Sequence, residues 1–127
     1  MNMIKSNPEQ FKKLDTNPNE GPFVMLNLLK FKAQGGAAAY SRYLNEASVF
    51  ADKVGSKILY LGKPYELLNG SEIWDLVMLV QYPSRKAFLQ LINNPEYIKV
   101  HKFREEACER AVLYATDPMK FKDLPRK

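Results

Sequence analysis

The sequence predicts an α+β domain of ferredoxin-like type, in which strands and helices follow the order βαββαβ behind a short N-terminal helix. Its 127 residues suit a single domain. That order places two helices on one face of an antiparallel split sheet and makes the first and third strands central. Both central segments are apolar on both faces, so the face without helices would expose a large apolar patch. We therefore expect a homodimer whose two sheets pack together as a dimeric α/β barrel.

The chain begins with the predicted short helix. Asn7 is a capping residue, Pro8 suits the first helical position, and Glu9 places an acidic group in the first turn. The helix should end near Leu14, and residues 15–22 then read as a turn-rich linker.

The first strand is predicted over residues 23–31, which are apolar at odd and even positions alike. Asn27 is the one polar residue embedded in this run. After a flexible Gly-Gly pair, residues 37–54 carry apolar side chains at helical spacing, and Gly55 is a good helix stop.

A second strand is predicted over residues 57–68, with a bend at Pro64 that suits an edge strand or a bulge. Asn69-Gly70 is the strongest hairpin-turn dipeptide in the chain. The third strand should run over residues 73–82, and it is again apolar on both faces.

A second helical region follows, with Ser84 as its N-cap. Residues 93–95, Asn-Asn-Pro, interrupt it, and a further helical segment should run to about Arg110. Residues 111–115 form the last expected strand, which Asp117-Pro118 ends.

The expected division of the chain has three parts: an N-terminal helix and linker over residues 1–20, the ferredoxin-like domain over 21–116, and a basic C-terminal tail over 117–127. Cys108 is the only cysteine, so the chain forms no internal disulfide and no cysteine-based zinc cluster. We expect neither a metal nor a cofactor. The start of the sequence lacks the apolar stretch of a signal peptide, which favours a cytoplasmic location.

The formal net charge of +5 raises the question of nucleic-acid binding. The basic residues are scattered, and no recognised nucleic-acid-binding motif accompanies them. We interpret them as solvated surface charge and expect no nucleic-acid partner. No run of residues approaches the length of a membrane span, so we expect no membrane partner either.

Four separated segments, residues 21–31, 74–75, 82–88 and 95–97, resemble in order the family called domain of unknown function 1330. The resemblance covers about residues 21–116. It implies the dimeric α/β-barrel fold, whose superfamily includes cofactor-free quinol monooxygenases, haem-degrading monooxygenases, chlorite dismutase-like enzymes and small-ligand binders. No settled reaction comes with the family, because one fold hosts many functions.

Haem is not expected in this chain. The haem-degrading relatives carry their iron-ligating histidine in mid-helix, near the position that Gln90, Leu91 and Ile92 occupy here. None of these side chains ligates haem iron.

His101 is the only histidine and the first candidate for a catalytic group. Helical spacing places it on one stripe with Tyr97, Arg104 and Cys108. A base between a phenol and a guanidinium would suit proton abstraction from an acidic phenol or enol. The alternative is a histidine at the helix surface or in a capping role.

Asn27 and Asp75 lie in adjacent apolar strands of the expected topology, and both have odd numbers. Buried polar groups need partners, so the two side chains either bond each other or the backbone, or orient a ligand between sheet and helices. Both interpretations stay open.

Several aromatic residues suit the lining of a pocket for a planar molecule: Tyr40, Tyr43, Tyr60, Trp74 and Tyr82. Aromatic stripes also occur in cores and dimer interfaces, which is the alternative here. Tyr97 and Arg104 complete the expected substrate-binding set.

Three function classes remain. The protein is a metal-free enzyme of the monooxygenase or isomerase kind, a non-catalytic binder of a small aromatic or apolar molecule, or a structural dimer with a filled core. The first would use His101 as base, with Asn27 and Asp75 orienting the substrate.

Overall fold

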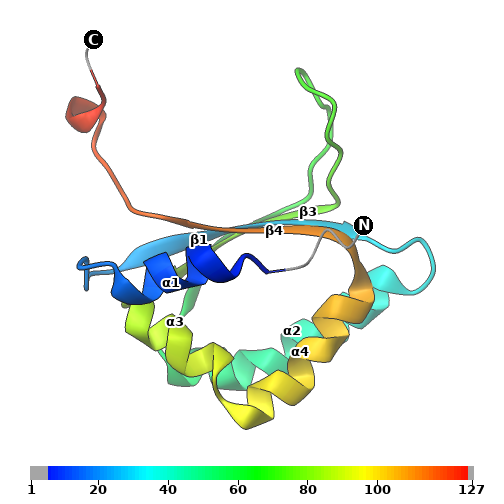
Figure 1. Cartoon of the computed structure of the whole chain (residues 1–127). Helices are drawn as coiled ribbons and strands as arrows, with labels where there is room; N and C mark the ends of the chain where they lie inside the picture. The colour runs from blue at the N-terminus through cyan, green and yellow to red at the C-terminus, as the bar shows by residue number, and fades with distance from the viewer. Residues whose placement is uncertain (1–5, 126–127) are drawn as a thin grey trace.

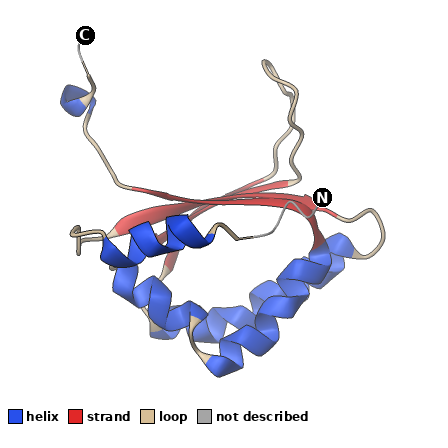
Figure 2. Ribbon diagram, viewed as in Figure 1, coloured by secondary structure: helices blue, strands red, loops and turns tan. Residues whose placement is uncertain are grey.

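The computed structural model describes residues 6–125 and contains one four-stranded sheet with all its α-helices on one side (Figures 1 and 2). The sheet is antiparallel throughout, in the order β2-β3-β1-β4. This is the ferredoxin-like arrangement that the sequence predicts. In chain order the elements are α1 (Pro8–Thr16), β1 (Phe23–Phe31), α2 (Gly36–Lys53), β2 (Lys57–Gly62), β3 (Leu76–Tyr82), α3 (Arg85–Ile92), α4 (Pro95–Ala107), β4 (Cys108–Thr116) and the short 3-10 helix η1 (Phe121–Asp123).

β1 lies in the middle of the sheet, and its pairing with β3 and β4 decides which residues of those strands face the helices. Its odd-numbered residues from Phe23 to Leu29 are buried toward the helices, and its even-numbered residues are half-buried on the outer face. Asn27 is opposite Met78 on β3 and Leu113 on β4. Even-numbered β3 residues and odd-numbered β4 residues therefore share the helix side.

Local sequence signals explain where the helices begin. The Ser84 hydroxyl accepts a hydrogen bond from the Ala87 amide at 3.0 Å and caps α3. The Asn94 side chain accepts one from the Glu96 amide at 2.9 Å and caps α4, with Pro95 at the first position. The predicted interruption of the second helical region is thus the junction between α3 and α4.

Four elements, β2, β3, α4 and β4, differ in extent from the prediction by three residues or more. β2 ends at Gly62 and β3 begins at Leu76, so the two strands pair but Asn69-Gly70 lies within a long connection and not in a tight hairpin turn directly between them. Residues 63–75 instead form an arm that projects from the outer face of the sheet (Figure 1). α4 ends earlier than expected, at Ala107, and β4 begins directly at Cys108 because its pairing with Phe31 across a β-bulge takes precedence over helical continuation.

Among residues 6–125, no α-helix packs on the outer face of the sheet (Figure 2). The residues that register places there are mostly apolar: Val24, Leu26, Leu28, Val77, Leu79, Val112 and Tyr114. Residues 117–125 leave the sheet on this same side, as does the arm of residues 63–75 (Figure 1). Arg126 and Lys127 of the expected basic tail lie outside the described residues.

The described helices do not include one that is both long enough and apolar enough to cross a membrane. The expected division of the chain at residues 20 and 116 stays a prediction.

Candidate ligand cavity

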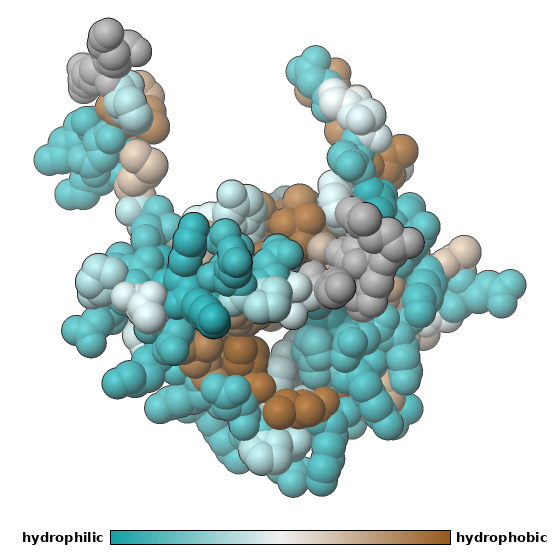
Figure 3. Space-filling model, viewed as in Figure 1, coloured by the Kyte–Doolittle hydropathy of each residue, from teal (hydrophilic) through white to brown (hydrophobic). Residues whose placement is uncertain are grey.

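An open cavity of about 1710 Å³ lies between the inner face of the sheet and the helices. Figure 3 shows the hollow between the sheet layer and the helices, with apolar residues at its border. Typical ligand pockets measure roughly 300–1,000 Å³. The additional volume reflects a wide mouth, which α1 borders through Phe11 and Leu14.

The floor of the cavity is formed by the central strands. Met25 and Asn27 contribute from β1, and Met78, Val80 and Tyr82 from β3. All five are buried, because strand alternation turns them toward the helices. Asn27 is the only polar amide on this apolar floor, and its side chain makes no hydrogen bond to another described residue.

α4 forms one wall through Tyr97, His101 and Arg104. Their spacing of four and three residues keeps the three side chains on one helix face, as the sequence predicts. α2 packs against α4 and adds Tyr40 and Tyr43. The hydroxyl oxygens of Tyr43 and Tyr97 lie 2.7 Å apart and share a hydrogen bond across the two helices.

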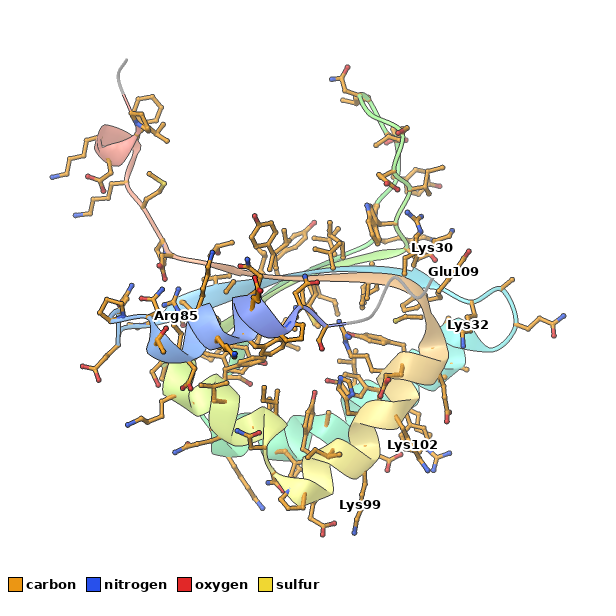
Figure 4. All side chains as sticks on the ribbon, viewed as in Figure 1. Lys30, Lys32, Arg85, Lys99, Lys102 and Glu109 are labelled. Carbon is orange, nitrogen blue, oxygen red and sulfur yellow. The ribbon has the colours of Figure 1, made fainter. Side chains whose placement is uncertain are left out.

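Arg104 is buried, with 8% of its surface exposed. Its Nη2 atom has no hydrogen-bond partner among the described residues, and within that part of the chain the guanidinium forms no salt bridge. Lys99 and Lys102 of the same helix point away from the cavity into solvent (Figure 4). Arg104 is the only lysine or arginine among the described residues that line the cavity.

Burial raises the pKa of the four cavity tyrosines: Tyr40, Tyr43, Tyr82 and Tyr97. The charge of Arg104 opposes that rise in all four, so the guanidinium lies within electrostatic reach of each phenol. The tyrosines therefore stay neutral at physiological pH and act as hydroxyl donors and acceptors.

His101 has the opposite shift. Burial, and then the positive charge of Arg104, lower its pKa, while the carboxylate of Glu105 partly restores it. The Nδ1 atom of His101 lies 3.3 Å from Oε1 of Glu105. The imidazole is therefore neutral at pH 7, the form that accepts a proton.

Asp75 does not line the cavity. Its carboxylate accepts a hydrogen bond from the Phe31 amide at 2.8 Å and is 3.4 Å from Nζ of Lys30. Grouping Asp75 with Asn27 because both have odd numbers was wrong. In this antiparallel register, odd-numbered residues of β1 lie opposite even-numbered residues of β3. Asp75 instead ties the end of β1 to the segment before β3.

Trp74 also lies apart from the cavity. It precedes β3, and the Arg110 guanidinium stacks over its indole at 4.7 Å from the ring centroid. Arg110 also bonds Glu72 and donates to the Ile73 carbonyl at 2.9 Å. These contacts hold the base of the arm in position, and they assign Trp74 a structural role.

The cavity also includes residues that sequence reasoning did not select. Phe11 and Leu14 of α1 line its mouth, and their spacing of three residues was the available signal. Leu91 and Ile92 of α3 line it with carbon atoms alone, so the position expected for an iron ligand does not fit haem. Among residues 6–125, no group of three or more acidic, histidine or cysteine side chains is placed to hold a metal ion.

Comparison with known families identifies residues 29–117 as a domain of unknown function, DUF1330. The chain belongs to this family. The match covers most of the domain that the sequence segments indicated, and it includes every helix that forms the cavity wall except α1. None of the curated proteins compared with the chain matches it.

Solved structures extend the comparison. A protein of unknown function from Rhodopseudomonas palustris is 31% identical, with a TM-score of 0.87, over 94% of this chain and 99% of that chain. A dimeric ferredoxin-like protein of unknown function from Bacteroides fragilis is 13% identical, with a TM-score of 0.54, over 77% and 97%. A candidate antibiotic biosynthesis monooxygenase from Caulobacter crescentus is 13% identical, with a TM-score of 0.58, over 80% and 92%. The last two establish likeness of fold alone.

Proposed function

We propose that this member of the DUF1330 family binds a small, flat, largely apolar molecule in the cavity between its sheet and its helices. The observation that carries the proposal is the cavity itself, with methionine, valine and aromatic side chains around a few convergent polar groups. Concave apolar sites with a few placed polar groups are the usual form of small-molecule sites. A structural dimer with a filled core would have no such space.

The polar groups favour chemistry on an acidic C–H or O–H group. The neutral imidazole of His101 accepts the proton, and the bound substrate becomes an enolate or phenolate. Asn27 orients the substrate from the floor, and the Tyr43–Tyr97 pair closes the wall beside His101. Returning the proton to another carbon of the substrate gives an isomerase reaction. In a monooxygenase reaction the carbanion carbon forms a C–O bond with dioxygen, the peroxide takes the proton back from His101, and loss of water from the hydroperoxide leaves one oxygen atom in a carbonyl product. Asp75 and Trp74 have no part in this proposal.

The test combines binding with turnover. Quinols and anthrone-like phenols are screened by thermal shift, since a ligand that binds only the folded state raises its stability whether or not it reacts. Oxygen uptake and isomerisation are then followed with each compound that binds.

His101→Gln should abolish turnover and leave binding within a few-fold of the original. Lys102→Gln, an exposed change on the same helix, is the matched control. Full turnover by His101→Gln would exclude this base, and binding without turnover by the unmodified protein would favour the non-catalytic binder.

We also propose that the protein is a homodimer whose outer sheet faces pack together. The support is the apolar outer face around Leu26, Leu79 and Tyr114, which no α-helix of the described part of the chain covers (Figure 2). The dimeric Bacteroides fragilis protein has the same fold.

The two projecting segments support the same arrangement. Tyr65, Leu68 and Phe121 are 82%, 85% and 85% exposed in the single chain, yet all three are large and apolar. They extend from the side on which the second sheet would lie (Figure 1), where contact with a partner would remove them from water.

Sedimentation velocity tests the dimer. Leu26→Glu should shift the protein to the monomer, because it buries a charge in the middle of the sheet-to-sheet contact. Val49→Glu, an apolar-to-charged change on the exposed side of α2, should leave the dimer intact. A monomer in the unmodified protein at high concentration would exclude the proposal. A cytoplasmic location stays a prediction.

A further inference from the structure

Arg104 is a buried cation without an anion among the described residues. The other buried arginine, Arg85, pairs with Asp117 at 3.0 Å and lies at the opposite end of the helix layer (Figure 4). The two acidic residues that line the cavity, Asp52 and Glu105, are exposed, and Glu105 faces His101 instead. Burying an unpaired charge costs several kcal/mol, so folded proteins normally supply a counter-charge.

A second unpartnered group faces the same cavity. The hydroxyl of Tyr40 is buried and, like Nη2 of Arg104, has no hydrogen-bond acceptor within residues 6–125. Its ring is held firmly, with ring centroids 5.3 Å from Phe31 and 5.4 Å from Tyr43. The Arg104 guanidinium lies close enough to the Tyr40 hydroxyl to oppose the rise of its pKa by charge and by a hydrogen-bond contact, in which the phenol oxygen can only accept. The Tyr40 O–H and Nη2 of Arg104 are therefore both left as donors without an acceptor among the described residues.

We propose that the ligand of this cavity is an aryl carboxylate, whose carboxylate accepts hydrogen bonds from Nη2 of Arg104 and the Tyr40 hydroxyl. This deepens the proposed function, on which it rests for the cavity and for the apolar body of the ligand. The aromatic ring would lie over the floor formed by Met25, Val80 and Tyr82. A guanidinium and a hydroxyl match the two oxygens of a carboxylate in charge and in donor number.

The charge count favours a carboxylate over a phosphate. One guanidinium balances one negative charge, and no lysine or second arginine among the described lining residues would balance another. The other described lining residues near Arg104 are the tyrosines, the neutral imidazole of His101, the exposed carboxylate of Glu105 and carbon side chains, and none of these supplies a second positive charge. A ligand with a single negative charge and an apolar body would match both the Arg104 guanidinium and the apolar floor of the cavity.

Isothermal titration calorimetry with four probes on the full chain tests this inference: naphthoate, the neutral isostere naphthamide, naphthol and naphthyl phosphate. Naphthoate should bind roughly 10- to 100-fold more tightly than naphthamide, since a charged hydrogen bond is worth more than a neutral one. Naphthyl phosphate should bind no better than naphthamide.

Two variants test whether the difference in affinity between naphthoate and naphthamide depends on Arg104 and Tyr40. Arg104→Met keeps the length of the side chain without its charge and should equalise naphthoate and naphthamide. Tyr40→Phe keeps the ring and should weaken naphthoate several-fold. Arg42→Met is the matched control, because Arg42 lies on the exposed side of α2 and pairs with Glu46 at 2.7 Å. It should leave the preference unchanged.

Thermal unfolding of the free variants separates binding from structure. Since Arg104 has no partner among the described residues, Arg104→Met should unfold at the same temperature as the original or higher. A large fall in unfolding temperature would instead assign Arg104 a structural partner and overturn the inference. Equal affinities for naphthoate and naphthamide in the unmodified protein would also overturn it while the proposed function stands. Failure of all four probes would overturn the carboxylate inference, and the quinol screen would then decide the proposed function by itself.

Discussion

The hydrogen bond between Tyr43 and Tyr97 joins α2 to α4 and allows the stability of the cavity wall to be tested quantitatively. The two hydroxyl oxygens are 2.7 Å apart, and both residues are buried. The substitutions Tyr43→Phe and Tyr97→Phe each remove one hydroxyl and keep the ring, so ring packing at 6.4 Å between centroids is preserved. The double substitution removes both hydroxyls.

The magnitudes follow from what each variant leaves buried. A single substitution loses the bond and leaves one desolvated hydroxyl without its partner, which should lower the free energy of unfolding by about 1–3 kcal/mol. The double variant leaves no unpaired hydroxyl and should lose only about 1 kcal/mol. The summed single effects would then exceed the double effect, with a coupling energy of about 1–5 kcal/mol.

Urea unfolding followed by far-UV circular dichroism measures these values. All variants are compared at one protein concentration, because the stability of the proposed homodimer would depend on concentration. A double variant whose loss equals the sum of the two single losses, to within about 0.5 kcal/mol, would refute the reasoning, since the two hydroxyls would then be energetically independent.

Two further predictions concern single residues. His101 has its pKa lowered from the ordinary value of 6.5, so the unfolded chain binds this proton more tightly than the folded one. The free energy of unfolding should therefore fall as pH drops below about 6.5, and His101→Gln should show a smaller fall in urea titrations at about pH 7 and about pH 5. Parallel losses in both proteins would remove His101 as the cause. Asp75→Asn weakens the bonds to the Phe31 amide and Lys30, so it should cost about 1 kcal/mol of stability and leave naphthoate affinity unchanged. A loss of naphthoate affinity in Asp75→Asn would show instead that Asp75 takes part in the ligand site.

Local patterns predicted most of the fold. The two-sided apolar character of residues 23–31 and the caps at Ser84 and Asn94 are short-range signals, and strand β1 and helices α3 and α4 begin where those signals place them. The predicted end of the second strand at residue 68 was wrong, because strand length depends on a pairing partner. Beyond Gly62 no neighbouring strand offers one among the described residues.

Short-range signals likewise predicted one part of the candidate site and failed for the other. Tyr97, His101 and Arg104 belong to one helix, and helical spacing alone predicts that they share a face. Asn27 lies in β1 and Asp75 directly precedes β3, so their relation depends on the register of the two strands. A register shift of one residue turns every side chain to the other face, so equal parity says nothing until the pairing is known.

The sequence alone determined the order of the elements, the apolar character of both sheet faces and the stripe on α4, because each depends on the spacing of neighbouring residues. Only the tertiary structure decided that Asp75 and Trp74 lie outside the cavity and that residues 63–75 form an arm. It also decided that Nη2 of Arg104 and the Tyr40 hydroxyl face the cavity without an acceptor among residues 6–125. The physical reason is that burial and hydrogen-bond satisfaction depend on which distant segments meet. That meeting is decided by strand register and helix packing over the whole chain.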